Sequence, residues 1–325
     1  MTGCTKALAI ACLGLAGLVA CGGGGSSGPT SPPVVPSPRP SGLPAGTVLT
    51  IVSGEDGQPV TTAKVTVGGQ QYQTDASGAV SLTASATWGT LVDVVSAGYL
   101  DRQTLVRRDG TRIALWPVLP HMGFDSDYIA QLVYTAGTAN PPPQGSTPLR
   151  RIPPGTTAAS VSVSSEIAAD DGMMAMHESA VASMNSADGG RVIYSVVTTR
   201  PTSGEAFDVK IDSADPICTD NTLAYTQVSV SGNDIVGGRI VYCGPDVAKT
   251  STVTHELGHT FGLQHSLAWT DLMAGIRQRG VAQDFGPREI LAMALMLQRP
   301  SGNRFPDNDR DIPAARRGTV TFICR

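Results

Sequence analysis

Residues 46–118 are dominated by short runs in which apolar and polar side chains alternate. Four runs show this alternation most plainly: residues 48–52, 63–67, 80–82 and 92–95. Side chains of a strand point in turn to its two faces, so each run predicts a strand with one buried face. Glycine-containing turns separate the runs. Closely spaced strands with glycine turns predict a small all-β sandwich.

Residues 119–325 combine strand and helix patterns. Residues 158–167 alternate as a strand, and residues 168–184 carry apolar side chains at helical spacing. The helical stripe consists of Met173, Met176, Ala180 and Met184. Such a stripe indicates core packing rather than a cofactor site. Further strand patterns follow at residues 191–197, 206–211, 223–230 and 238–243. Strand, helix and then several strands is the order of an α+β domain.

Two more helices are predicted toward the C-terminus. One covers residues 247–261 and the other covers residues 287–298. Asp246 is the expected N-cap of the first, because an aspartate side chain accepts hydrogen bonds from the first turn. The core face of that helix is formed by residues that recur every four positions: Val253, Leu257 and Phe261.

The first 20 residues have the composition of an export signal. Lys6 and the amino terminus supply positive charge, and residues 7–20 are nearly all apolar or small, a stretch too short to span a bilayer. The stretch ends in Leu18-Val19-Ala20-Cys21, which resembles a bacterial lipobox. The resemblance implies that Cys21 is lipidated and becomes the first residue of the mature protein. The alternative is a plain secretory signal that is cut at a nearby small residue.

The residues after Cys21 agree with a lipid anchor. Gly22 stands where an aspartate would be associated with retention at the inner membrane, so the resemblance implies an exported outer-membrane or cell-surface lipoprotein. Residues 21–45 are rich in Gly, Ser and Pro and predict a tether. The expected partners are a membrane, through the anchor at Cys21, and no nucleic acid, because a net charge of −4 offers no basic face.

Export would place the remaining cysteines in an oxidising compartment, where one disulfide is expected. Cys218, Cys243 and Cys324 remain once the signal and the lipidated residue are set aside. Cys218 with Cys243 is the preferred pair, because both flank a strand pattern just before the helix predicted at residues 247–261. Pairing of Cys324 with either of them stays open.

The chain has five histidines, and three of them lie in the segment H-E-x-x-H-x-x-G-x-x-H that begins at residue 255. His255 and His259 are four residues apart, so both rings project from one face of a helix and can bind one metal ion. Gly262 permits the backbone to turn sharply at the end of the helix, which brings His265 close to the other two histidines as a third ligand. Three protein ligands leave one position open, which indicates a catalytic zinc site. Glu256 is placed to act on the proton of a metal-bound water.

This segment resembles the metzincin zinc peptidases, whose signature it matches at every position. Ser266 follows the third histidine and Met273 lies eight residues after it, an arrangement similar to the matrixin branch. The resemblance implies that Met273 is the Met-turn residue, which packs under the zinc ligands without binding the metal. It also implies a metzincin-like catalytic domain over residues 119–325, with a twisted mixed sheet beside the active-site helix. No cysteine-switch propeptide is visible, so latency through a cysteine ligand is not expected.

The implied activity is hydrolysis of peptide bonds by a monomeric, lipid-anchored zinc endopeptidase. Zinc lowers the pKa of its water to about 7 and polarises the scissile carbonyl, and Glu256 acts as the general base that later protonates the leaving amine. The partner is a protein or peptide substrate. Residues 223–230 are the expected edge strand that pairs with extended substrate. Residues 269–276 are expected to form the pocket for a substrate side chain.

Two other functions stay open at this stage. An adhesion protein could keep the histidines as a structural metal site, and a zinc hydrolase could cleave a non-peptide amide, such as one in the cell wall. Residues 46–118 fit each of these functions. They contain, in order, Gly-Gln-Pro-Val (57–60), Ala-Lys-Val-Thr-Val (63–67), Thr-Asp-Ala-Ser-Gly (74–78) and Ala-Gly-Tyr (97–99). This order resembles the carboxypeptidase regulatory-like domain, which implies a transthyretin-like sandwich without catalysis of its own. It would serve as a folding spacer or as a binding module.

The other polar residues are expected to be structural. His177 is interpreted as a surface or packed histidine, and His121 has no partner nearby in the sequence. Asp307, Asp309 and Asp311 alternate in a loop, a spacing that could suggest calcium. The loop lacks the glycine and terminal glutamate of an EF-hand, so a solvated turn is expected there.

Overall fold

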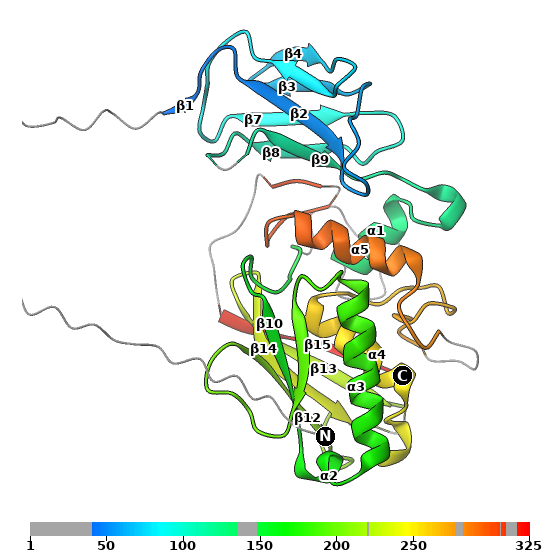
Figure 1. Ribbon diagram of the computed structural model, residues 1–325. Coiled ribbons are helices and arrows are strands. Elements are labelled where there is room, and N and C mark those ends of the chain that lie inside the picture. Colours follow the sequence, from blue (N-terminus) through cyan, green and yellow to red (C-terminus); the bar gives the residue numbers. More distant parts are fainter. Residues whose placement is uncertain are drawn as a thin grey trace, which may run out of the picture. The chain divides into compact units, whose positions relative to one another are not determined.

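The computed structural model of the protein describes residues 41–108, 110–134, 148–219, 221–276, 282–305, 307–309 and 317–325. The predicted export signal, Cys21 and most of the predicted tether lie outside these residues. The described part belongs to one compact unit, Pro40–Arg325. It has the predicted α+β fold, in which a β-rich N-terminal region precedes a mixed sheet with helices (Figure 1). Among the described residues, no helix is long and apolar enough to cross a membrane.

The N-terminal region contains two small sheets that share one core. The first sheet has the order β5 (Ala79–Ser81), β2 (Val48–Ser53), β9 (Arg112–Leu115). The second has the order β4 (Gln70–Gln73), β3 (Lys64–Val67), β7 (Leu91–Val95), β8 (Arg102–Leu105). A short pair joins β1 (Gly42–Leu43) to β6 (Ala86–Thr87). Ile51, Val65 and Val94 from the two sheets are buried in a single hydrophobic cluster, so the alternating pattern does define a buried face.

A six-stranded mixed sheet forms the centre of the second region. Its order is β11 (Ile193–Val197), β10 (Ala158–Val163), β12 (Glu205–Ile211), β14 (Asp234–Tyr242), β13 (Ala224–Ser231), β15 (Arg317–Cys324). The first four strands are parallel, whereas β13 runs antiparallel to both β14 and β15. Buried β-branched and aromatic residues such as Val161, Phe207 and Tyr242 favour these strands, because they pack well on a pleated surface.

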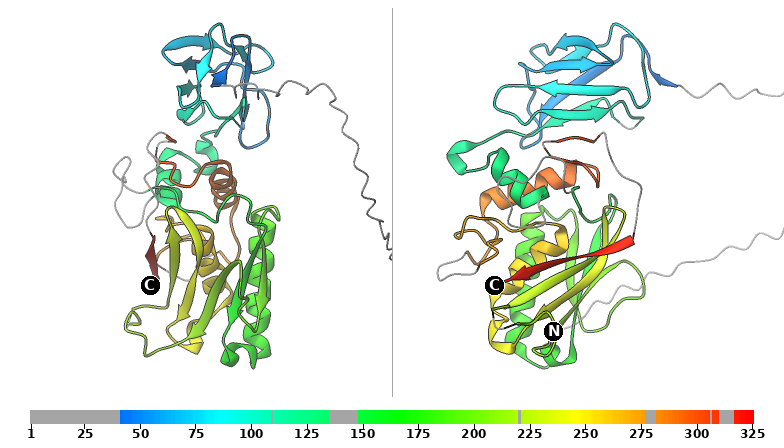
Figure 2. Two further views of the ribbon diagram at one scale, coloured as in Figure 1. Left: turned by 90° about the vertical axis from the view of Figure 1, so that its left-hand side faces the viewer. Right: turned by 180° about the vertical axis from the view of Figure 1, so that it is seen from behind.

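The expectation that residues 223–230 form the open edge of this sheet is wrong. β13 has β14 on one side and β15 on the other, and all 8 residues of β15 pair with it (Figure 2). Burial alternates toward the end of β15, where Phe322 and Cys324 are buried and Thr321 is exposed. Pairing depends on how the buried and exposed faces of two strands match and not on their distance along the chain, so β15, not β13, forms the edge of this sheet.

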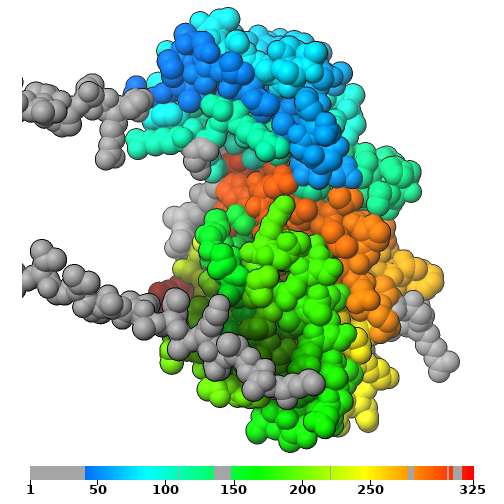
Figure 3. Space-filling model, in the orientation of Figure 1, coloured from blue at the N-terminus to red at the C-terminus, as the bar shows by residue number. Residues whose placement is uncertain are grey.

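Helices α3 (Asp171–Ala187) and α4 (Thr250–Phe261) pack against each other and against the sheet (Figure 1). The Asp170 side chain caps α3 by accepting a hydrogen bond from Met173 N at 3.0 Å. This cap starts the helix three residues later than predicted, after the short helix α2 (Ser165–Ala168). On the face shown in Figure 3, the outer side of α3 lies at the surface, so its other side supplies the core contacts.

Helix α4 also begins later than predicted. Residues Pro245–Val247 form a short 3-10 turn, η2, and the helical backbone starts at Thr250. Asp246 therefore lies inside this turn and is not the N-cap; Lys249 holds that position without a side-chain hydrogen bond. The predicted core face is correct, because its three members are buried: Val253, Leu257 and Phe261.

Two more helices lie among the described residues of this region. α1 (Ser126–Tyr134) packs against α5 (Pro287–Gln298), which has the predicted bounds. Leu100 and Trp116, which flank the last strands of the N-terminal region, are buried in the same hydrophobic cluster as residues of these helices. The two regions thus share core packing, and the domain boundary at residue 118 stays a prediction.

Asp307 and Asp309 do not lie in a solvated turn, which corrects the expectation for that loop. Both are buried, and Arg102 of β8 pairs with Asp307 at 2.6 Å and with Asp309 at 2.7 Å. Arg299 pairs with Asp307 at 2.6 Å. Burial alone would raise the pKa of Asp307, but the two guanidinium groups outweigh it and lower that pKa. Arginines therefore neutralise these carboxylates; Asp311 lies outside the described residues.

Candidate metal centre

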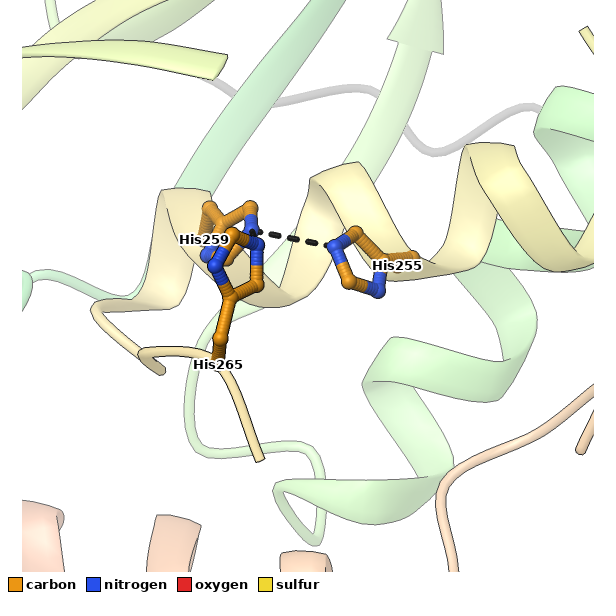
Figure 4. A group of neighbouring side chains, drawn as sticks. All are labelled: His255, His259 and His265. Atoms are coloured by element: carbon orange, nitrogen blue, oxygen red, sulfur yellow. Dashed lines mark hydrogen bonds between the residues drawn. The ribbon is translucent and has the colours of Figure 1, made fainter. Parts of the chain in front are cut away.

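Helix α4 positions the first two histidines of the motif. The rings of His255 and His259 extend from the same side of the helix (Figure 4). A backbone carbonyl orients each ring: His255 Nδ1 lies 2.7 Å from the oxygen of Leu272, and His259 Nδ1 lies 2.7 Å from that of Leu263. Only a protonated Nδ1 can donate to a carbonyl. Each neutral ring therefore keeps a lone pair on Nε2, the atom that a metal would bind.

Gly262 ends α4 and turns the chain toward the third histidine. Its φ is +116°, and its N–H donates to carbonyl oxygens of the last turn. A Cβ at this position would lie 2.1 Å from the carbonyl oxygen of Arg150. Both the backbone conformation and the space therefore require glycine. His265, three residues later, extends back toward the other two rings (Figure 4).

The three rings meet at their Nε2 atoms. His259 Nε2 is 3.1 Å from His255 Nε2 and 3.1 Å from His265 Nε2. Lone pairs that face each other at such distances repel unless a cation lies between them. Zinc–nitrogen bonds of about 2.0–2.1 Å in a tetrahedral site place the nitrogens about 3.3 Å apart, so the spacing fits a zinc ion. The three side chains could thus hold a metal.

The electrostatics of the rings agree with this geometry. Burial lowers the pKa of His265 to about 4. Burial, helped by the neighbouring His265 and His255 rings, lowers the pKa of His259 well below its usual value. Metal binding requires neutral imidazoles, and burial favours the neutral form of the His259 and His265 rings.

Glu256 lies beside the triad and is held by the neighbouring strand. Its Oε2 accepts a hydrogen bond from Thr226 Oγ1 at 2.5 Å, and Thr226 Oγ1 is also 3.1 Å from the carbonyl oxygen of Glu256. Thr226 lies on β13, so the sheet orients the carboxylate relative to α4. A carboxylate held next to a metal site can accept a proton from water. Sequence reasoning missed Thr226, because no local pattern links residues that far apart.

Met273 packs against α4 between the two helical histidines. A Cβ at Gly258 would lie 2.5 Å from Met273 Sδ and 3.0 Å from its Cε, so the thioether fills the space beside that glycine. Met273 is fully buried. Leu272, just before it, supplies the carbonyl that orients His255. The segment around Met273 therefore packs against the part of α4 that carries two of the candidate metal ligands.

Glu289 of α5 holds this segment in place. Its carboxylate accepts the backbone N–H of Met273 at 2.8 Å and that of Gly286 at 2.7 Å. Burial raises the pKa of Glu289 to about 7, although both N–H groups lower it. The sequence offered no sign of this contact, because the pattern at residues 287–298 predicted only a helix.

Ser266 ties the segment after the third histidine to the Met273 segment. Its N–H donates to the carbonyl oxygen of Met273 at 2.7 Å, and its hydroxyl donates to Asp271 at 2.5 Å. Arg288 forms an ion pair with the same Asp271 carboxylate. The motif identified Ser266, but its partners Asp271 and Arg288 are visible only in the structure.

Strand β15 adds two residues that sequence reasoning did not connect with the site. Phe322 stacks on the His259 ring, with centroids 4.4 Å apart and an angle of 5° between the planes. Cys324 Sγ and ligand atoms of His255 and Glu256 all lie within 4.8 Å of one another. His255, Glu256, His259 and Cys324 each have 0% exposure. The site is thus closed to solvent on the side that β15 covers.

The structure accounts for the other predicted residues as follows. Cys218 and Cys243 are joined in a disulfide, which does not include Cys324. His177 is a packed histidine, buried edge-on against Tyr242. His121 is exposed. Within residues 269–276, the predicted side-chain pocket, Trp269 and Ile276 are exposed whereas Leu272 and Met273 are buried.

Comparisons with known proteins give no evidence about function, so the functional argument rests on the geometry of the site. No family model matches the chain, and no curated protein matches it. Among solved structures, 17 chains match. One is metalloproteinase-II from Bacteroides fragilis, whose crystal structure aligns over 77% of this chain and 85% of that chain, with 12% sequence identity and a TM-score of 0.31. At this level of similarity the alignment carries no conclusion about function.

Proposed function

We propose that the protein is a zinc-dependent endopeptidase. The observation that carries the proposal is the convergence of three imidazoles, through their Nε2 atoms, next to a carboxylate held by Thr226. Three nitrogen ligands leave one position on a tetrahedral zinc ion for water or substrate, as catalytic sites require. The Glu256 carboxylate lies within 4.8 Å of a ring nitrogen of His255, close enough to take a proton from a water at that position.

The roles of the residues follow from their contacts. A bound zinc ion would polarise the scissile carbonyl and lower the pKa of water to about 7. Glu256 takes the proton of the attacking water and delivers it to the leaving amine. Thr226 holds Oε2 of this carboxylate and so sets the direction of Oε1. The carbonyls of Leu272 and Leu263 keep His255 and His259 in the orientation that exposes Nε2 to the metal.

The test measures metal content and peptide cleavage on the same samples. We expect one zinc ion per chain, measured by inductively coupled plasma mass spectrometry. We also expect cleavage of a broad peptide library, with the cleavage sites mapped by mass spectrometry. Glu256→Gln should retain zinc and lose cleavage by about 10²–10⁴-fold, which is the contribution of a general base. Glu178→Gln, an exposed glutamate of α3, is the matched control and should cleave normally.

The negative outcomes separate the rival functions. Stoichiometric zinc without cleavage by any variant would indicate a structural metal site, as in an adhesion protein. Cleavage of a cell-wall amide but of no peptide would indicate the non-peptide hydrolase. Both outcomes contradict the endopeptidase.

We also propose that the enzyme is exported and held at the outer membrane or cell surface by lipid on Cys21. The support is the lipobox-like sequence that ends at Cys21 and the Gly/Ser/Pro tract after it. Cys21→Ser should move the protein from the membrane fraction to the soluble fraction. Unchanged retention on the membrane would refute the anchor.

A further inference from the structure

Strand β15 occupies the place where an extended peptide would join the sheet. It runs antiparallel to β13 from Ser231 opposite Arg317 to Ala224 opposite Cys324. Thr226, which holds Glu256, pairs directly with Phe322. Residues paired across an antiparallel ladder share a face, so Phe322 lies on the side of the sheet that faces the catalytic glutamate. A peptide bound along β13 would have to take this same position.

The end of β15 is fastened on both sides of the metal centre. Leu223 N–H donates to the carbonyl oxygen of Cys324 at 3.0 Å, and Arg325 N–H donates to that of Gly275 at 3.2 Å. Gly275 belongs to the segment after Met273, and a Cβ there would lie 2.9 Å from the His265 ring. This end of β15 and Arg325 therefore bridge β13 and the segment after Met273, which packs against the third histidine.

The side chains of β15 reach the site itself. Phe322 covers the His259 ring in a parallel stack at 4.4 Å. Cys324 Sγ lies within 4.8 Å of His255 and Glu256 ligand atoms, in a cluster whose three members are all buried. Thiolate is a strong zinc ligand, with bonds of about 2.3 Å. Three imidazoles and one thiolate make a complete tetrahedral donor set.

We propose that β15 is an inhibitory strand, in which Cys324 supplies the fourth ligand of the metal and Phe322 blocks access to His259. Coordination replaces the water on the ion with the Cys324 thiolate, and the thiol proton leaves to solvent. With Cys324 bound, the thiolate would take the position on the metal that a water or a substrate carbonyl needs. The enzyme becomes active when β15 leaves β13. This inference rests on the proposed function and runs against the expectation that no cysteine ligand enforces latency.

The first test observes the metal and needs no activity. Zinc X-ray absorption of the full-length wild-type protein should show one sulfur at about 2.3 Å and nitrogen ligands at about 2.0–2.1 Å. Cys324→Ser should lose the sulfur contribution. With cobalt in place of zinc, the wild type should show a thiolate-to-metal charge-transfer band that Cys324→Ser lacks. A wild-type zinc site with nitrogen and oxygen neighbours only would overturn the inference and would leave the peptidase proposal standing.

The second test observes cleavage. Cys324→Ser and Phe322→Leu should each raise the rate of library cleavage by about tenfold or more, because apparent activity scales with the fraction of open molecules. Thr319→Ala is the matched control, since Thr319 lies on the same strand with its side chain exposed; its rate should equal that of the wild type. Equal rates in all four proteins would overturn the inhibitory role. Sulfur at the metal with no cleavage by any variant would support the ligand and contradict the peptidase.

Discussion

Replacing Gly258 by alanine tests how tightly the Met273 segment packs under the metal ligands. The new Cβ would lie 2.5 Å from Met273 Sδ, 3.0 Å from its Cε and 3.2 Å from Cε1 of Phe285. Met273 is fully buried and Phe285 is nearly so, so neither can move into solvent. At least one of them, or α4 itself, must shift.

Two opposing effects decide the sign of the change in stability. Alanine is a better helix former than glycine, which stabilises α4 by about 1 kcal/mol. Overpacking of a buried site costs about 1–3 kcal/mol. Two contacts at or below 3.0 Å with a buried side chain place this site at the upper end of that range. We therefore expect Gly258→Ala to lower the free energy of unfolding by about 1–2 kcal/mol.

The assay is urea unfolding of the metal-free protein followed by circular dichroism. Gly172→Ala in α3 is the control, because its Cβ would meet only the Asp170 carboxylate at 3.2 Å; it should be neutral or stabilising by up to about 1 kcal/mol. The clash should also disappear when its partner is truncated. In a Met273→Ala background, Gly258→Ala should no longer destabilise, which gives a coupling energy above about 1 kcal/mol. The reasoning fails if Gly258→Ala is as stable as the wild type, or if its cost is the same in both backgrounds.

Three further predictions concern buried polar contacts. Thr226→Val removes the hydrogen bond to Glu256 and should lower kcat roughly 10- to 100-fold with zinc content and KM unchanged; an equal change in KM and zinc content would indicate a purely structural role. The folded pKa of Glu289 is raised from 4.5 to about 7. Its contribution to stability is therefore complete below pH 4.5 and is lost as pH rises toward 7, a fall on the order of 3 kcal/mol. Urea unfolding from pH 4 to 8 should show this slope in the wild type and not in Glu289→Gln, and equal slopes would refute it. Asp307→Asn leaves buried arginines without a counter-charge and should cost about 3–5 kcal/mol, whereas Asp208→Asn in an exposed pair should cost less than about 1 kcal/mol; similar losses in both would refute the role of burial.

The candidate ligands were predictable because their arrangement is local. Four residues along a helix return a side chain to the same face, and a glycine with positive φ turns the chain after it. His255, His259 and Gly262 therefore carry their geometry in their spacing. The α5 bounds and the buried face of α4 followed from the same short-range rules. The start of α4 did not, because Asp246 lies in a separate turn, η2, that sequence spacing alone does not distinguish from a helix N-terminus.

The contacts that complete the site could not be predicted in this way. Thr226 and Glu256 are 30 residues apart, and Met273 and Glu289 are 16 apart. Such pairs depend on which strand lies beside α4 and on where α5 docks. Asp307 shows the same limit: its loop is polar in sequence, but Arg102 and Arg299 enclose it in the folded chain.

By itself, then, the sequence determined a helix that presents two imidazoles, the turn that returns a third, and a glutamate beside them. These follow from backbone geometry over a few residues. Only the tertiary structure decided what surrounds them. The pairing of β15 with β13 brings Phe322 against His259 and Cys324 close to His255 and Glu256, and it covers the side of β13 that was expected to be open. Strand pairing joins residues at any separation along the chain, so β15 can pair with β13 although no local sequence pattern predicts this pairing.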